Sequence, residues 1–234
     1  MRIDVLTLFP RMFESFLTES ILGKAIEAKT VEVNIIDFRE YSDNKHHKVD
    51  DSPFGGGAGM VLNIQPIHSA LTNIKGYKEA LKIMVSPQGE TLKQEKAYSL
   101  SNEKHIIILC GHYEGYDERI RDYFDIEISI GDYVLTGGEL AAMVLIDSVT
   151  RVIPSVIGKD ESHLNDSFSN ILLEHPHYTR PRDFEGKKVP DILVSGDHKK
   201  IEKWRLEQSI KRTKTRRPDL FDAYENQLKE SKDK

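Results

Sequence analysis

Hydrophobic and polar positions along the chain switch repeatedly between two periods, which predicts strands alternating with helices. Residues 31–38 repeat with the period of two that is typical of a strand, and residues 3–9 form an apolar run that suits a buried strand. Pro10 is expected to begin a helix, and residues 65–74 have helical spacing. Further strands are predicted within 82–89, 105–115 and 126–130. This alternation predicts an α/β domain with a largely parallel sheet.

The rest of the chain is organised around the stretch at 126–152. Its strand breaks at a loop that contains Gly131, Gly137 and Gly138. Thr136 and Glu139 then have the spacing of a capping box, and the apolar run at 140–146 predicts a helix that is buried on nearly every face. Because glycine lets a ligand approach the backbone closely, the loop is a candidate small-molecule site. Its spacing matches neither Gly-x-Gly-x-x-Gly nor Gly-x-x-x-x-Gly-Lys, so the usual dinucleotide and nucleoside-triphosphate loops are not supported.

Two other predicted strands also end in glycine. The strand within 82–89 is expected to finish in a turn at Ser86, Pro87 and Gly89, and the strand within 105–115 has glycines at its carboxyl end. In open parallel sheets the ligand crevice lies outside the carboxyl ends of the strands, so the three loops are predicted to converge on one pocket. An ordinary turn glycine is the alternative for each position taken singly.

Residues 39–59 have no strong periodicity, which indicates a long loop. Gly55, Gly56, Gly57 and Gly59 permit a backbone whose successive N–H groups face one anion or carbonyl. A flexible lid is the alternative.

Length and composition exclude several classes of protein. The longest uninterrupted apolar run in the 234 residues has seven members, whereas a membrane span needs about 20. The single Cys110 excludes an internal disulfide, and the histidines include no Cys/His cluster with zinc spacing, so no metal site is predicted. We therefore expect a soluble cytoplasmic protein without a membrane partner.

The charge is unevenly distributed. The net charge is −5, but residues 199–217 alone carry +7, which leaves −12 for the remainder. A basic stripe on an acidic body suggests a docking surface for a polyanion, and a solvated helix face is the alternative. The polar stretch at 158–167 is interpreted as a flexible linker between a domain at 1–157 and a small helical domain at 168–234.

The segment from Ser129 to Leu140 resembles the cofactor loop of the bacterial tRNA (guanine-N1)-methyltransferases, the TrmD family of the knotted SPOUT class. Residues 50–60 resemble the family segment Asp-Asp-x-Pro-x-Gly-Gly-Gly-x-Gly-Met, although Ala58 stands where the family more often has proline. Further stretches in the family's order and spacing are 109–119, 175–181, 185–186, 189–190, 195–198 and 204–205. The resemblance therefore covers almost the whole chain.

This resemblance implies an activity and an architecture. The activity is transfer of a methyl group from S-adenosylmethionine to N1 of guanosine at tRNA position 37, just 3′ of the anticodon. The architecture is a deep trefoil knot within a mostly parallel sheet, in a homodimer whose active site lies at the subunit interface. The resemblance also implies a response to Mg²⁺, for which the sequence offers no ligand cluster.

The chemistry of this reaction sets requirements for two side chains. N1 of guanine carries a proton, so a base must remove it, and negative charge then develops on O6, where a cation lowers the barrier. By position in the family motifs, Asp166 is the implied general base and Arg151 the implied partner of O6. From the residues alone, Asp166 could instead cap a helix starting near Phe168, and Arg151 could pair with Asp147.

Asp166 lies in the predicted linker, so we expect the base to reach the pocket only when RNA orders that segment. A dimer would let one subunit present Asp166 to the cofactor of the other subunit. If the site is shared in this way, a mixture of Arg151→Ala and Asp166→Ala subunits is expected to recover part of the activity.

The resemblance also assigns the binding residues. Those implied at the cofactor are Ser86, Pro87, Gly89, Gly111, Tyr113, Glu114, Ile130, Gly131, Asp132, Tyr133, Val134, Leu135, Gly137 and Gly138. Glu114 could hold the cofactor's ammonium group or a magnesium ion, and a surface carboxylate at a helix start is the alternative. The basic residues expected to neutralise phosphates of the anticodon stem-loop are Lys199, Lys200, Lys203, Arg205, Lys211, Arg212 and Arg216.

Two other functions are weighed against this one. A knotted methyltransferase acting on ribosomal RNA needs no basic C-terminal domain, so deletion of residues 168–234 should abolish only a tRNA activity. A non-catalytic RNA-binding module has no use for three glycine loops at strand ends, and a cofactor titration separates it from an enzyme.

Overall fold

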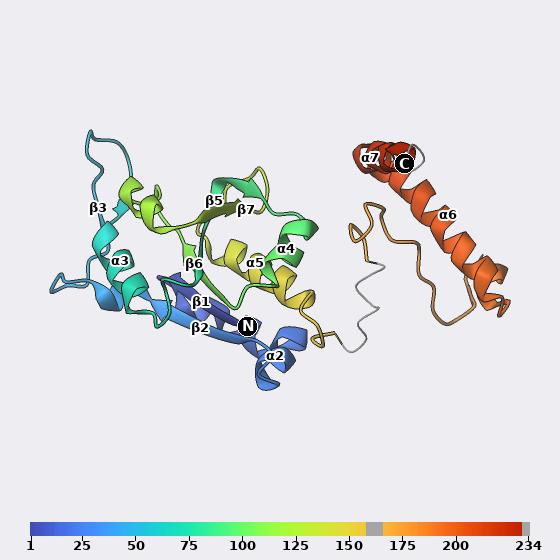
Figure 1. Ribbon diagram of the computed structural model, residues 1–234, viewed down its shortest axis with the longest axis horizontal. Helices are drawn as coiled ribbons and strands as arrows, with labels where there is room; N and C mark the ends of the chain where they lie inside the picture. Colours follow the sequence, from blue (N-terminus) through green and yellow to red (C-terminus); the bar gives the residue numbers. More distant parts are fainter. Residues whose placement is uncertain (158–165, 231–234) are drawn as a thin grey trace. The chain divides into compact units, whose positions relative to one another are not determined.

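The computed structural model describes residues 1–157 and 166–230 (Figure 1). The chain divides into two compact units, Met1–Gly158 and Lys159–Lys234. Residues 158–165 of the predicted linker, and with them most of the segment expected to become ordered on RNA, lie outside the described residues. None of the described helices combines the length and the apolar character needed to cross a membrane.

The first unit is built on a five-stranded sheet in the order β2-β1-β6-β5-β7. Every pair of neighbouring strands is parallel, which confirms the predicted α/β class and the parallel sheet. The strands are β1 (Arg2–Thr7), β2 (Glu32–Asp37), β5 (Leu81–Thr91), β6 (His105–Cys110) and β7 (Ile126–Ser129). A separate two-stranded sheet pairs β3 (Asp50–Asp51) with β4 (Val61–Leu62).

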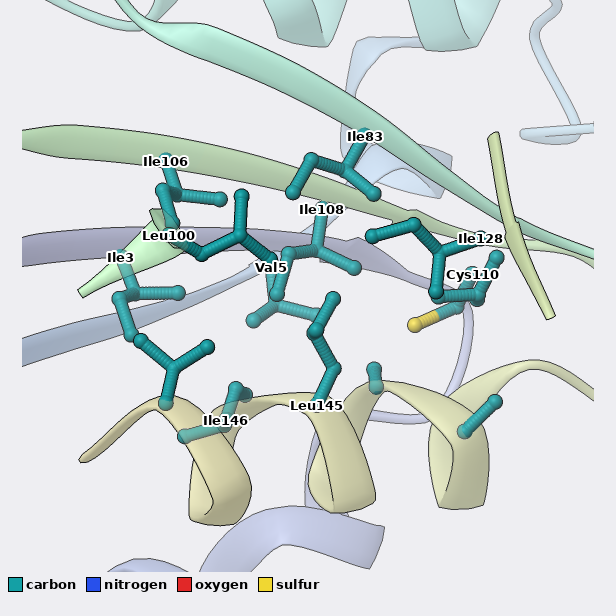
Figure 2. Close-up of a cluster of buried hydrophobic side chains, with 14 of the residues drawn as sticks. Ile3, Val5, Ile83, Leu100, Ile106, Ile108, Cys110, Ile128, Leu145 and Ile146 are labelled. Atoms are coloured by element: carbon teal, nitrogen blue, oxygen red, sulfur yellow. The ribbon is translucent and has the colours of Figure 1, made fainter. Parts of the chain in front are cut away.

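Helices cover both faces of this sheet. One core contains side chains of α2 (Ser20–Glu27), α4 (Gln94–Leu100) and α5 (Glu139–Arg151). Figure 2 shows Ile3 of β1, Ile83 of β5, and Ile106 and Ile108 of β6 on the side of the sheet that faces Leu145 and Ile146 of α5. The second core contains side chains of α3 (Ile64–Asn73). The remaining helical segments of this unit are η1 (Pro10–Phe13), α1 (Glu14–Thr18), η2 (Phe38–Tyr41) and η3 (Glu118–Tyr123).

The start and the burial of α5 differ from the sequence prediction. Gly138 is the N-cap and no side chain caps the helix, so the predicted capping box is wrong. The reason is that the Glu139 carboxylate turns inward and accepts a hydrogen bond from Thr7 instead. The prediction of burial on nearly every face is wrong as well, because Leu140 and Val144 are 50% and 46% exposed on the side away from the sheet.

The second unit is mainly helical. Its long helix α6 (His198–Arg216) contains the predicted helical spacing around Trp204, and Pro218 then begins α7 (Pro218–Glu230). A short helix, η4 (Asp191–Val194), and a two-stranded hairpin of β8 (Asp183–Phe184) and β9 (Lys187–Lys188) precede α6. The helix weighed as an alternative near Phe168 does not form, because residues 167–170 make a turn in which Phe168 has a φ of +74°.

Candidate functional site

The carboxyl ends of β5, β6 and β7 surround a cavity of about 400 Å³ in the first unit. All three glycine-containing loops line it, which confirms that they converge on one pocket. The implied cofactor residues that line the cavity are Ser86, Pro87, Gly111, Tyr113, Glu114, Ile130, Gly131, Tyr133, Val134, Leu135, Gly137 and Gly138. Gly89 and Asp132 are not among the lining residues.

Two glycines allow the start of α5 to pack against the end of β6. The Gly138 amide donates to the Gly111 carbonyl at 2.8 Å. A Cβ atom at Gly138 would lie 2.8 Å from the Gly111 nitrogen and 2.9 Å from the Cys110 Cα, and neither backbone atom can easily move away. A Cβ atom at Gly111 would lie 2.6 Å from the hydroxyl of Tyr116. Glycine at 138 is therefore required by close backbone packing, and glycine at 111 leaves room for the Tyr116 side chain.

Gly89 serves strand packing. We predicted that the strand ends in a turn at Ser86, but β5 continues through it to Thr91, with a register shift between Val85 and Glu90. A Cβ atom at Gly89 would lie 2.5 Å from the backbone of Glu127 and Ile128 in β7. The absence of a side chain thus lets the irregular part of β5 remain paired with its neighbour.

The loop after β7 is folded on itself by local hydrogen bonds. Ser129 Oγ accepts from the Gly131 amide at 3.1 Å, and the Tyr133 amide donates to the Gly131 carbonyl at 2.9 Å. Gly131 has a φ of +141°, which favours glycine. The compact loop leaves Val134 84% exposed.

The carboxylate of Glu139 joins three segments of the chain beside the pocket. It is 1% exposed, accepts from Thr7 Oγ1 at 2.7 Å and lies 3.1 Å from Nε2 of His112, which itself lines the cavity. The Phe9 ring lies 4.6 Å from the His112 ring, between centroids. Sequence reasoning missed this network because it interpreted Glu139 as part of a helix cap.

Arg121 joins three further segments at the cavity. Its guanidinium pairs with Glu118 of η3 at 2.9 Å, contacts Glu127 of β7 and donates to Gln88 of β5 at 3.3 Å. Arg121, Glu118 and Gln88 all line the cavity, and none of them was predicted. The only sign in the sequence that they belong to the pocket was their position at or after the carboxyl ends of predicted strands.

Two titratable side chains in the pocket wall are held neutral. Burial raises the pKa of the Cys110 thiol well above its usual value, and the Glu139 carboxylate raises it further. Burial likewise raises the pKa of the Tyr116 phenol well above its usual value. Cys110 therefore offers no thiolate for nucleophilic chemistry.

The glycine-rich segment lies against one edge of this pocket. The Glu114 amide donates to the Met60 carbonyl at 3.0 Å, and a Cβ atom at Gly59 would lie 2.4 Å from Cγ of Glu114. Tyr113 has a φ of +59°, an uncommon conformation for a residue with a side chain, and is half exposed. The segment is thus a neighbour of the pocket carboxylate.

The two candidate catalytic residues lie in different units. Arg151 is the exposed last residue of α5, so the twelve helical steps from Glu139 place it about 18 Å along the axis from the pocket end. Asp166 is half-buried in the second unit, and its backbone carbonyl accepts from the Ser169 amide at 3.2 Å. Residues 167–170, directly after it, form a turn and not a helix, so the capping alternative is wrong.

The basic residues assigned to RNA all lie on α6, but their surroundings differ. Lys200 pairs with Asp197 at 3.0 Å, and Arg212 donates to the Glu174 carbonyl at 3.0 Å. Lys203 is 4.0 Å from Glu207. The exposed members that form no ion pair with another described residue are Lys199, Arg205, Lys211 and Arg216.

Among the described residues, Glu174, His175 and His177 are the group whose ligand atoms lie close enough together, within 4.8 Å, to hold a metal ion. The sequence analysis did not single out this cluster, whose signal is the His-x-His spacing. Burial, His177 and the cations Arg205 and Arg212 lower the pKa of His175. The same cations disfavour a metal ion there.

Comparison with known proteins matches residues 1–223 to the family described as tRNA (Guanine-1)-methyltransferase TrmD. The chain is 58% identical over 235 residues to a tRNA (guanine-N(1)-)-methyltransferase of Bacillus pumilus, covering 99% of this chain and 96% of the relative. It is 59% identical over 233 residues to the protein of that name from Shouchella clausii, with the same coverage. The protein of that name from Bacillus subtilis is 58% identical over 224 residues, covering 94% of this chain and 92% of the relative.

Proposed function

The chain belongs to the tRNA (guanine-1)-methyltransferase family TrmD, and from this premise we propose that it transfers the methyl group of S-adenosylmethionine to N1 of guanosine 37 in tRNA. The observation that carries the proposal is the pocket formed by the ends of β5, β6 and β7, whose loops contain the family's cofactor motifs. A cavity of about 400 Å³ is of the size that binds a small molecule of this class.

The residues of the pocket fit a nucleoside-containing cation. When bound, S-adenosylmethionine supplies an electrophilic methyl group on a sulfonium. Gly111 and Gly138 keep the floor of the pocket free of side chains, so main-chain groups from Ile130 to Leu135 can hold the adenosine part. Glu114 is the carboxylate at the edge that would meet the ammonium group, or a magnesium ion if one is required.

The reaction at the base is carried by two side chains of this chain. Asp166 takes the proton from N1, which frees a lone pair on the nitrogen. Arg151 donates hydrogen bonds to O6 and stabilises the negative charge that develops there. Cys110 and Tyr116 do not serve as the base, because burial raises the pKa of both side chains and keeps them protonated.

The position of Arg151 supports an active site shared between two subunits. About 18 Å of helix separates it from the pocket end of α5, which is more than an arginine side chain can span. Leu140 and Val144 expose an apolar stripe along the same helix, the kind of surface that a homodimer covers. In this arrangement Arg151 and Asp166 of one subunit both serve the pocket of the other.

The path of the chain around the pocket supports the knot. The connection from β6 to β7 passes β5 in the sheet, and the chain then returns from β7 to the end of β6. There Gly138 bonds to Gly111, and His112 forms a bridge with Gly137. We propose that this return passes through the loop formed by the preceding connection.

The direct test is mass spectrometry of nucleosides from unmodified tRNA after incubation with the protein and isotope-labelled S-adenosylmethionine. We expect labelled 1-methylguanosine from tRNA with guanosine at position 37, and none when adenosine replaces that guanosine. Label in another nucleoside, or in ribosomal RNA but not tRNA, contradicts the proposal.

A subunit-mixing experiment tests the shared site. Gly138→Val subunits, whose own pocket is filled, are mixed with Asp166→Ala subunits. If half the dimers are mixed and each has one working site, we expect about a quarter of the parental activity. A mixture of Arg151→Ala and Asp166→Ala should stay inactive, because both residues come from the same subunit. This reverses the outcome expected from the sequence, and recovery in that mixture contradicts the arrangement.

A further inference from the structure

The hairpin of β8 and β9 in the second unit lies outside the basic helix assigned to RNA. Asp183 pairs with Lys188 and Phe184 with Lys187. The Val189 amide donates to the Arg182 carbonyl at 2.9 Å, so the pairing extends by one more step. The two turn residues between the strands have positive φ, as a tight hairpin requires.

The two faces of this hairpin differ in chemistry. Side chains alternate along a strand and paired residues share a face, so Arg182, Phe184 and Lys187 lie on one face, which we call the hairpin face. Asp183 and Lys188 lie opposite each other on the other face, where their charges offset. The hairpin face therefore presents one aromatic ring between two cations.

The groups of the hairpin face are available to a ligand. Phe184 is 60% exposed. Arg182 and Lys187 are exposed, and neither forms an ion pair or a side-chain hydrogen bond with another residue that the structure describes. Several cations of α6 differ in this respect, because Lys200 pairs with Asp197 and Arg212 supports the Glu174 carbonyl. Within the described part of the chain, the hairpin cations have no such structural partner.

An exposed ring flanked by cations matches the chemistry of a single-stranded nucleic acid. Unpaired bases stack on aromatic side chains, and the adjoining phosphates are neutralised by lysine and arginine. A duplex offers no free base face for the ring, so the occupant is an unpaired nucleotide. An exposed phenylalanine alone would need no explanation, but here it shares one face with two cations that pair with no carboxylate among residues 1–157 and 166–230.

We propose that the hairpin face binds an unpaired nucleotide of the tRNA substrate, with Phe184 stacked on its base and Arg182 and Lys187 on the flanking phosphates. The inference rests on the proposed function, because it takes tRNA as the substrate. It adds to that function a second RNA contact, separate from the residues assigned on α6.

The test measures the dissociation constant of unmodified tRNA for the full-length protein across a series of salt concentrations. Phe184→Leu keeps the apolar bulk and removes the aromatic face, so we expect binding to weaken about tenfold. Phe184→Tyr keeps the ring and should bind within about twofold of the parent. If Phe184→Leu binds like the parent, or if both variants weaken equally, stacking is excluded.

The cations are tested by matched substitutions on the two faces. Lys187→Gln should weaken tRNA binding and lower the salt slope by about one. Lys188→Gln, a neighbouring substitution on the face that also carries Asp183, should leave the slope unchanged. Equal effects at the two lysines overturn the assignment to one face.

Failure of this inference is distinguishable from failure of the proposed function. Every variant is also assayed for S-adenosylmethionine binding, which should stay at the parental level because the pocket lies in the first unit, and the parent is assayed for 1-methylguanosine formation. If the parent makes no 1-methylguanosine, the proposed function fails. If the parent makes it while the hairpin variants keep parental tRNA affinity, only the hairpin assignment fails.

Discussion

The two units of the molecule hold their functional residues in opposite ways. In the first unit, helices pack on both faces of a parallel sheet, and the pocket is formed where buried backbone segments touch. In the second unit, Leu172 and Thr213 are the buried residues among those described. Thr213 Oγ1 accepts from the Leu173 amide at 2.9 Å and donates to the Ser209 carbonyl at 2.7 Å, which anchors the chain to α6.

This contrast predicts how each unit responds to substitution. Close packing cannot adapt to an added atom, so changes in the pocket wall should have large and local effects. Exposed charges contribute separately, so changes on α6 should have small and additive effects on RNA binding. Substitutions at matched positions in the two units test this contrast.

The largest effect on binding is expected at Gly138. In Gly138→Ala the new Cβ meets the backbone of Gly111 and Cys110, so the start of α5 must shift and the pocket changes shape. We expect the affinity for S-adenosylmethionine, measured by calorimetry, to fall by about 5- to 150-fold, since overpacking of this kind costs about 1–3 kcal/mol. Gly56→Ala is the comparison, because its φ of +79° strains an alanine while a Cβ there meets nothing within 4 Å, so it shows backbone strain without overpacking. Equal losses in the two variants would show that packing at Gly138 is not the cause.

Glu139 should affect stability more than any surface carboxylate. In Glu139→Ala, the Thr7 hydroxyl and the His112 ring each lose a buried partner, so we expect the free energy of unfolding to fall by about 2–4 kcal/mol. Glu14→Ala removes a carboxylate that is 72% exposed, and it should cost about 0.5 kcal/mol or less. Denaturant titration of both variants measures the difference. Similar costs contradict a structural role for the buried carboxylate.

Two neighbouring residues of α6 separate RNA contact from structural support. Lys211→Ala should weaken tRNA binding a few-fold and lower the salt slope by about one, without changing stability. Arg212→Ala should also lower the stability of the second unit, by about 1–2 kcal/mol, because Arg212 donates to the Glu174 carbonyl. Filter binding and thermal unfolding of the two variants check this. If Arg212→Ala is as stable as the parent, Arg212 does not support the structure and does not differ from Lys211 in this respect.

The smallest effect concerns pH in the second unit. Burial, His177 and two arginines lower the pKa of His175, so the unfolded chain takes up the proton first as the pH falls. The contribution to stability is therefore present above the usual histidine pKa, about 6.5, and is lost as the pH falls below it. We expect thermal unfolding of the second unit to move to lower temperature between about pH 7 and pH 5. In His175→Gln, the unfolding temperature should depend less steeply on pH. If its dependence on pH is the same as in the parent, His175 is excluded as the source.

The sequence predicted features that follow from local patterns. Alternation and apolar, β-branched runs predicted the strands of the parallel sheet, and the rule for open sheets placed three glycine loops at one pocket. Prediction from the sequence failed where contacts between residues far apart in the chain determine the local structure. Thr7 and Glu139 are 132 residues apart in sequence, and their hydrogen bond displaced the expected helix cap.

The roles of individual glycines also depend on residues that are distant in the sequence. Gly89 and Gly138 look alike as turn residues in the sequence. One lets β5 approach β7, and the other lets α5 start against β6, because different backbone segments lie beside them. Only the packed structure tells the two roles apart.

The central claim is that the first unit binds the methyl donor while Asp166 of the second unit supplies the base. The most direct measurement is a single-turnover assay of Asp166→Asn, combined with calorimetry of S-adenosylmethionine binding to the same protein. We expect the donor affinity to stay within about twofold of the parent and the rate of 1-methylguanosine formation to fall at least about 100-fold. Methylation at the parental rate, or a loss of donor binding as large as the loss of rate, would contradict the account.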